Sequence, residues 1–587
     1  MLTNFSVGYF SLFWLIFLIL LGACAPLRPI QTPPEELDGE PPPAYPFSSQ
    51  QKVEIPVEAS ALSHFAKGQI LLGRGEWKQA ASEFAAAVEA DPASAYLRSR
   101  WAALLLQTGQ LDQALKQAEE AVRLEPERIE FRLLLAGLYS STGLDSKAIE
   151  EYGRVLGSDP KNQESLLYLG ALQLKLGNFD EAKRNLEQLL SLNPGSAMAY
   201  YYLGRVRART KLYLAAEESY RKALEIEPKS EPVLLELALV LELQGKTEEA
   251  MQTYRKLLEA NQKNPWARKR LGELYVGQNK LDDAMSQFQV LEKIEADPRE
   301  TRTKIGLIYY EKGEFERAAT EFNLVLAGDP ENHRVRYYLG ATYVELKALE
   351  RAVEEFSRIS ETSDYFIDSR IQLGYLYERR GEIPKAISSI QAALQKQNQK
   401  ELLVLLAGLH RKAKDYPKAL DILHQAVTLD PKDDQLHFQL GAVYDETKNK
   451  EKTQEHMRKA IELNPKNAPA LNYLGYTWAE MGVRLEEAEK LILRALEVEP
   501  ADGFYIDSLG WVYYQRGDYR KAVEQLERAV ELTGDDPTIT EHLGDAYEKV
   551  GKPDRALDLY RAALKWSKEE EQSKRIKEKT QLLEKKI

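Results

Sequence analysis

The chain has 587 residues, with 79 Lys and Arg against 91 Asp and Glu, and a formal net charge of −12. An acidic chain with interspersed cations lacks the basic face that phosphate contacts need, so the composition argues against a nucleic-acid partner. Cys24 is the only cysteine, which excludes a disulfide within one chain.

The N-terminus carries a short apolar segment. Residues 10–21 are apolar apart from Ser11, and the run Leu21-Gly22-Ala23-Cys24 closes the segment. An apolar run of about 12 residues suits a signal-peptide core, whereas a membrane span needs about 20. The apolar core, the small residues and the cysteine resemble the lipobox of bacterial lipoproteins. Residues 1–23 contain no Lys or Arg, which departs from the usual basic start of such signals.

This resemblance implies that residues 1–23 are removed as a signal peptide and that Cys24 carries the lipid. Two or more acyl chains hold a protein stably on a bilayer. The next residue is Ala25 and not Asp, which resembles sorting to the outer membrane of Gram-negative bacteria. The expected location is therefore the outer membrane, with the body of the protein in the periplasm. The alternative is an uncleaved N-terminal anchor followed by a cysteine without a role.

Residues 24–60 form a candidate tether. Nine of the 26 prolines lie between residues 25 and 60. Proline lacks the backbone donor and fixes φ, so neither a helix nor a packed core is expected in this segment. An extended tether of this length reaches at most about 110 Å. A proline-rich docking ligand is the alternative.

From residue 61 onward the sequence repeats every 34 residues or so. Pro92, Pro126, Pro160, Pro194 and Pro228 are spaced by 34, at points where a helix is expected to end. Within each unit a small residue is followed after twelve positions by Ala and after sixteen by a bulky residue. We expect the small residues to let two helices approach closely. Because one helical hairpin cannot bury its apolar face alone, such units are expected to stack.

These markers at fixed offsets resemble the tetratricopeptide repeat. The resemblance covers residues 61–570 in about 15 units and implies an all-α fold, a solenoid of helix-turn-helix repeats in a right-handed superhelix. Residues 571–587 are rich in Lys and Glu, with apolar residues at helical spacing. We expect a C-terminal capping helix there, because repeat arrays need a polar end.

The sequence contains no pattern of catalytic or metal-ligating residues. None of the seven histidines forms a zinc-binding HExxH pair. Gly245-Lys246-Thr247 is similar to the end of a phosphate-binding loop, but Val240 stands where that loop needs glycine. We therefore expect no enzyme activity, no metal and no cofactor. An enzyme would require a catalytic domain outside the repeats, and no remaining stretch is long enough for one.

In the tetratricopeptide family the first helix of each unit lines the concave face. Positions two, five, nine and twelve of the unit point outward there. Read at these positions, the sequence predicts a partner-binding surface of aromatic and polar side chains, with packing between helices as the alternative for several of them. The residues are Tyr201, Arg205, Tyr310, Tyr337, Tyr375, Phe438, Asn472, Tyr476, Phe504, Asp507, Trp511 and Tyr514.

Residues 468–530 are the most distinctive part of the array. The strings Asn472-Tyr473-Leu474-Gly475-Tyr476 and Asp507-Ser508-Leu509-Gly510-Trp511 resemble a motif of bacterial repeat lipoproteins. Among these are outer-membrane adaptors that recruit a periplasmic C-terminal processing protease to cell-wall hydrolases. The resemblance implies a non-enzymatic scaffold whose partners are proteins, such as that protease and its clients. The alternative is a structural part of a polysaccharide-export machine or of a pilus or secretin assembly.

Overall fold

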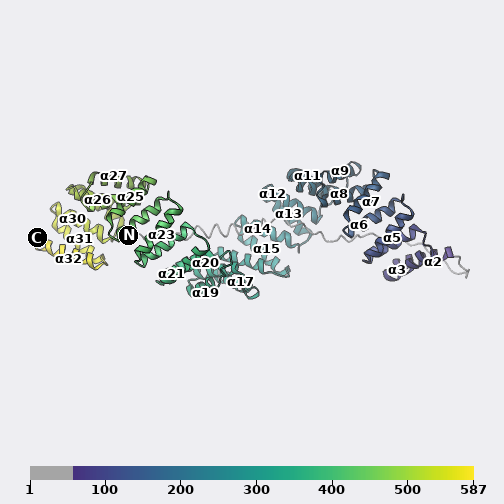
Figure 1. Ribbon diagram of the computed structural model, residues 1–587, viewed down its shortest axis with the longest axis horizontal. Coiled ribbons are helices and arrows are strands. Elements are labelled where there is room, and N and C mark those ends of the chain that lie inside the picture. Colours follow the sequence, from purple (N-terminus) through teal and green to yellow (C-terminus); the bar gives the residue numbers. More distant parts are fainter. Residues whose placement is uncertain (1–56, 587) are drawn as a thin grey trace. The chain divides into compact units, whose positions relative to one another are not determined.

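The computed structural model describes residues 57–586, where the chain forms 31 helices and no strand. The described residues fall into two compact units, which are the segments 57–312 (unit 1) and 313–586 (unit 2) (Figure 1). No helix among these residues is both long enough and apolar enough to cross a bilayer. Cys24, the expected signal peptide and most of the expected tether lie outside the described residues.

Unit 1 consists of helical hairpins in chain order. The first helix of each hairpin begins close to the 34-residue markers of the sequence. The hairpins are α2 (Val57–Gly73) with α3 (Trp77–Ala90), α4 (Ala95–Gln107) with α5 (Leu111–Leu124), α6 (Ile129–Ser141) with α7 (Asp145–Ser158), α8 (Gln163–Leu176) with α9 (Phe179–Leu192), α10 (Ala197–Arg209) with α11 (Tyr213–Ile226), α12 (Glu231–Leu243) with α13 (Thr247–Ala260), and α14 (Pro265–Gly277) with α15 (Leu281–Ile294), followed by α16 (Arg299–Glu311).

Unit 2 repeats the arrangement and ends in a single helix. It comprises α17 (Phe315–Gly328), then α18 (His333–Glu345) with α19 (Leu349–Ser357), α20 (Phe366–Arg379) with α21 (Ile383–Lys396), α22 (Lys400–Lys412) with α23 (Tyr416–Leu429), α24 (Asp434–Glu446) with α25 (Lys450–Leu463), α26 (Ala468–Glu480) with α27 (Leu485–Val498), α28 (Gly503–Gln515) with α29 (Tyr519–Thr533), α30 (Pro537–Lys549) with α31 (Pro553–Trp566), and α32 (Glu570–Glu584).

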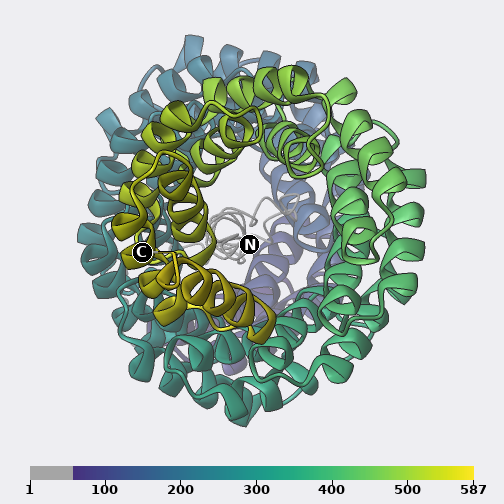
Figure 2. The same cartoon turned by 90° about the vertical axis from the view of Figure 1, so that its left-hand side faces the viewer.

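The hairpins of unit 2 stand side by side along a curve when they are seen from the end (Figure 2). Each helix packs against its partner in the hairpin and against the next hairpin. In addition, consecutive first helices contact one another, as α26 does with α28 and α28 does with α30. The first helices therefore form the inner layer of this unit.

Close contact within each hairpin depends on a glycine in the first helix. A Cβ atom added to Gly204 of α10 would lie 2.5 Å from a ring carbon of Tyr220 in α11. Tyr220 is fully buried, and it belongs to one hydrophobic core cluster with Val233 and Leu237 of the following hairpin. Tyr220 therefore helps to fill the space between two units. The structure shows that Tyr220 also closes the hairpin that contains it.

The turn between the two helices needs a left-handed residue. Gly usually supplies it, as at Gly245 with φ of 74°. In four repeats a lysine occupies the equivalent position, among them Lys211 with φ of 61° and Lys347 with φ of 57°. A side chain in this conformation is disfavoured by about 1–2 kcal/mol, so the lysines are not required by the backbone.

An arginine at the fourth position of the first helix fixes the preceding loop in several hairpins. The guanidinium of Arg336 donates to the carbonyl of Pro330 (2.5 Å) and to Glu355 of the second helix (2.6 Å). Arg98 makes the same pair of contacts, to the carbonyl of Pro92 and to Gln117 (2.7 Å). These bonds satisfy a loop carbonyl that the helices leave without a partner.

Candidate partner-binding surface

The predicted surface residues of unit 1 lie on α10 and α16. Tyr201 and Arg205 are half-buried on α10, with the guanidinium over the phenol ring at 5.6 Å. Arg205 also approaches Glu236 of α12, at 3.5 Å between Nε and Oε1. Tyr310 is half-buried on α16. The Arg205 guanidinium therefore already contacts two groups of the protein, the Tyr201 ring and the Glu236 carboxylate.

The first helices α12, α14 and α16 of unit 1 are joined by a ladder of opposite charges. Arg270 of α14 forms ion pairs with Glu242 of α12 and, at 2.8 Å, with Glu273 of its own helix. Lys304 of α16 completes the ladder by pairing with Glu273. These charges neutralise one another, so they offer a partner little net charge. Trp266, next to the ladder on α14, is 63 % exposed.

Trp266 was missed by the sequence prediction. It occupies position two of the unit that begins at residue 265, so the positional rule could have found it. An exposed tryptophan is a frequent energetic anchor of protein interfaces.

In unit 2 the structure buries three of the predicted surface residues. Tyr337 packs between Phe356 (5.5 Å between ring centroids) and Tyr365 (5.4 Å). Phe438 is buried against α26, with its ring at 6.4 Å from that of Tyr473. These two residues are core and not accessible surface, because aromatic neighbours cover them. Tyr375 is 40 % exposed on α20 and remains accessible.

Asp507 is also buried, as one half of a polar pair. His542 of α30 lies with Nδ1 at 2.9 Å from the Asp507 carboxylate, and both residues are less than 10 % exposed. Burial lowers the pKa of His542, but the Asp507 carboxylate, together with Asp545 and Glu541, outweighs this effect and the net pKa is raised. The pair joins α28 to α30. His542 was not singled out by the sequence prediction, because its role depends on the neighbouring hairpin.

The remaining predicted residues of α26 and α28 form one accessible patch, which we call the C-terminal aromatic surface. Trp511 stacks on Tyr514 (4.7 Å between centroids) and on His542 (4.0 Å), which fixes its orientation. Phe504 is 41 % exposed. The carbonyl oxygen of the Asn472 side chain and the Trp511 indole N–H are buried and have no hydrogen-bond partner among the described residues. The surface comprises Asn472, Tyr476, Phe504, Trp511 and Tyr514, all half-buried or exposed.

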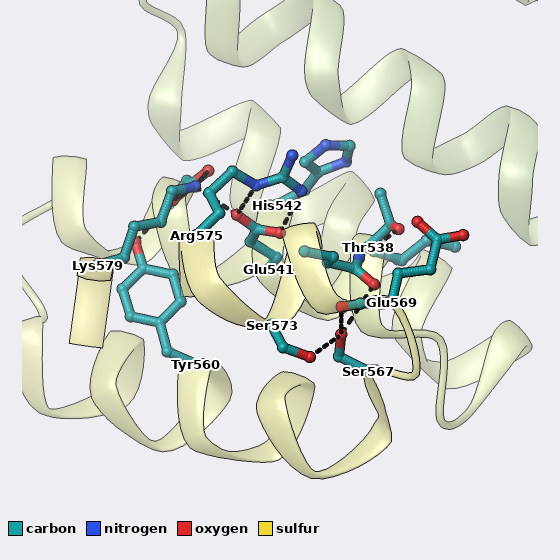
Figure 3. A network of polar contacts seen from close by, with 12 residues as sticks. Thr538, Glu541, His542, Tyr560, Ser567, Glu569, Ser573, Arg575 and Lys579 are labelled. Atoms are coloured by element: carbon teal, nitrogen blue, oxygen red, sulfur yellow. Dashed lines mark hydrogen bonds and ion pairs between the residues drawn. The ribbon is translucent and has the colours of Figure 1, made fainter. Parts of the chain in front are cut away.

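The inner face of the last hairpin is covered by the protein itself. Arg575 of α32 binds Glu541 of α30 through two bonds of 2.9 and 2.7 Å, and Lys579 binds Asp545 at 2.6 Å (Figure 3). Gln572 donates to Thr538 at 3.0 Å. The acceptors occupy positions two, five and nine of their unit. Because α32 lies where the first helix of another repeat would lie, the C-terminal aromatic surface ends at α28.

A pair of histidines lies elsewhere in unit 2, between α24 and α25. The Nδ1 atoms of His437 and His456 are 3.1 Å apart and the rings are stacked. Burial, followed by the neighbouring His437, lowers the pKa of His456 to about 4. Within residues 57–586 no three or more His, Cys, Asp or Glu side chains are arranged to hold a metal ion.

Comparison with known proteins agrees with this architecture. Sequence models described as tetratricopeptide repeat match residues 71–138, 109–171, 167–231, 209–263, 241–301, 303–365, 371–434, 434–467 and 538–575, and one described as TPR repeat matches residues 510–551. This chain belongs to the tetratricopeptide-repeat family. The predicted all-α repeat fold is therefore confirmed, and the fold is that of a scaffold for protein–protein interactions.

Individual relatives match only part of the chain. A TPR repeat-containing protein of Pseudomonas aeruginosa is 31 % identical over 128 residues, which are 22 % of each chain. Anaphase-promoting complex subunit 3 of Schizosaccharomyces pombe is 28 % identical over 128 residues, 22 % of this chain and 19 % of that protein. The chain thus matches about a fifth of the length of these curated relatives. A solved tetratricopeptide repeat protein from Parabacteroides merdae has a TM-score of 0.35 and 20 % identity, covering 42 % of this chain and 98 % of that structure.

Proposed function

We propose that this protein is a non-enzymatic scaffold that holds a protein partner on the C-terminal aromatic surface. The observation that carries the proposal is the pair Phe504 and Tyr476 with Trp511 beside them, on first helices that face inward. Aromatic side chains that are already fixed by neighbours contribute strongly to binding, because little side-chain freedom is lost.

We further propose that Cys24 carries lipid, and that the protein is held in the outer membrane with its repeats in the periplasm. This part is supported by the sequence alone, through the apolar residues 10–21 and the run that ends at Cys24. The partner that we propose is a periplasmic C-terminal processing protease, which the scaffold brings to cell-wall hydrolases. The resemblance of residues 468–530 to bacterial repeat lipoproteins supports it.

The test compares binding of the purified protease to the intact chain and to three variants. Phe504→Ala and Tyr476→Ala remove aromatic contacts from the surface, whereas Leu429→Ala truncates an exposed leucine elsewhere in unit 2. We expect each aromatic substitution to weaken binding roughly tenfold, as for interface anchors, and the leucine substitution to leave it unchanged. No binding by the intact chain rejects the protease as partner. Equal binding by all variants rejects the surface.

A further inference from the structure

Unit 1 exposes leucines at four consecutive turns between paired helices. These turns join α6 to α7, α8 to α9, α10 to α11 and α12 to α13. The leucines are 40–72 % exposed, although large apolar side chains usually pack into the core of a repeat protein. We call this edge the leucine rim; it consists of Leu144, Leu176, Leu212, Leu214 and Leu243.

The turns of the rim lie next to one another. Lys175, which precedes Leu176, binds Asp145 of the previous hairpin at 2.8 Å. Gln244, which follows Leu243, donates to the backbone carbonyl of Tyr213 at 3.4 Å. Tyr213 stands between Leu212 and Leu214. The central turns are held together because α10 packs against both α8 and α9. The five leucines therefore line one continuous edge of unit 1.

The fold does not require leucine at this edge. Leu144 and Leu212 precede the second helix of their hairpins, with φ and ψ of −84° and 54° and of −85° and 62°. Gln110 and Lys246 hold the equivalent positions of other repeats with nearly the same angles. A polar residue thus serves the same backbone. Contiguous exposed apolar surface without a structural reason marks an interaction site.

Two cations beside the leucines point to the occupant. Arg209 ends α10, where its charge also acts on the Glu236 carboxylate of α12, and Lys211 occupies the left-handed turn position. Leucines flanked by Lys and Arg suit a bilayer interface, where the leucines enter the acyl region and the cations meet phosphate.

We propose that the leucine rim rests on the surface of a lipid bilayer that contains anionic headgroups, and so holds unit 1 against the membrane. The inference rests on the membrane attachment proposed above. Residues 25–60 reach at most about 110 Å when extended, which allows unit 1 to return to the membrane that holds the N-terminus. Overall the chain carries a net charge of −12, so contact with an anionic surface depends on local cations such as Lys211.

The experiment places an environment-sensitive fluorophore on the rim of the full chain. Leu214→Cys is labelled in the chain purified from membranes with Cys24 retained, because a lipidated Cys24 has no free thiol. Lys229→Cys, in the loop at the opposite end of α11, is the control. The vesicles contain phosphatidylglycerol and phosphatidylethanolamine. We expect a blue shift of the label at position 214 and its quenching by lipids that are brominated in the acyl chains, without either change at position 229.

Flotation of the same samples separates the two proposals. A chain that floats while both labels stay in water contradicts the rim but leaves membrane attachment standing. A chain that does not float contradicts both. With the label at position 214, Leu212→Glu should abolish the blue shift, and Leu429→Glu, an equally simple change in unit 2, should keep it. An unchanged shift on vesicles of phosphatidylcholine alone contradicts the role of the cations.

Discussion

The packing of α10 against α11 predicts that the same substitution, glycine to alanine, has opposite effects on stability at two positions of unit 1. Gly204→Ala adds a Cβ atom at 2.5 Å from the ring of fully buried Tyr220, well inside ordinary contact. Gly137→Ala, in α6 of the same unit, adds a Cβ atom whose nearest neighbour outside that helix, the Tyr152 hydroxyl, is 3.9 Å away. Both changes gain up to about 1 kcal/mol of helix propensity. Only the first also overpacks the core, at a cost of about 1–3 kcal/mol.

We therefore expect Gly204→Ala to lower the free energy of unfolding by about 1 kcal/mol and Gly137→Ala to raise it by about 0.5–1 kcal/mol. Urea unfolding followed by far-UV circular dichroism measures both, since a stability change shifts the midpoint. Equal shifts for the two variants, or a higher midpoint for Gly204→Ala, would refute the view that glycine sets the spacing inside the hairpin.

Three further changes test other parts of the structure. Arg336→Ala leaves the mostly buried Glu355 carboxylate without its main partner and should cost about 3 kcal/mol of stability. Arg98→Ala removes the partner of a neutral amide, that of Gln117, and should cost about 1 kcal/mol. Thermal melts of the two variants compare these losses. The depressed pKa of His456 favours the neutral ring in the folded state. The free energy of unfolding should therefore fall by up to about 2 kcal/mol between pH 7 and pH 5. Urea titrations of His456→Gln over the same pH range should show a smaller fall. Lys347→Gly relieves a left-handed lysine and should raise the melting temperature, contrary to the loss expected for an ordinary lysine-to-glycine change.

The repeat itself was readable from the sequence because its markers act locally. Proline ends helices, and polar residues such as Asn264 cap the next one, so α14 begins at Pro265. The partner surface was less readable. Tyr337 and Asp507 occupy outward positions, yet Tyr365 and His542 cover them. Which side chain covers which depends on the neighbouring hairpin, and no rule based on position within one unit includes that information.

The contact between α32 and α30 was present in the sequence but not recognised. Glu541 and Arg575, like Asp545 and Lys579, are separated by 34 residues, which is one repeat length. If the final helix is taken as the first helix of an incomplete repeat, opposite charges meet at equivalent positions. The sequence analysis predicted a capping helix but no ion pairs between this helix and α30, because a polar end was expected to face solvent.

Photocrosslinking in cells can show directly whether the C-terminal aromatic surface holds the protease. A photoreactive amino acid at position 504, on the C-terminal aromatic surface, is compared with one at position 429, which is similarly exposed. We expect position 504 to yield one discrete adduct containing the processing protease and position 429 to yield none. Identical adduct patterns from both positions, or no adduct from position 504, would contradict it.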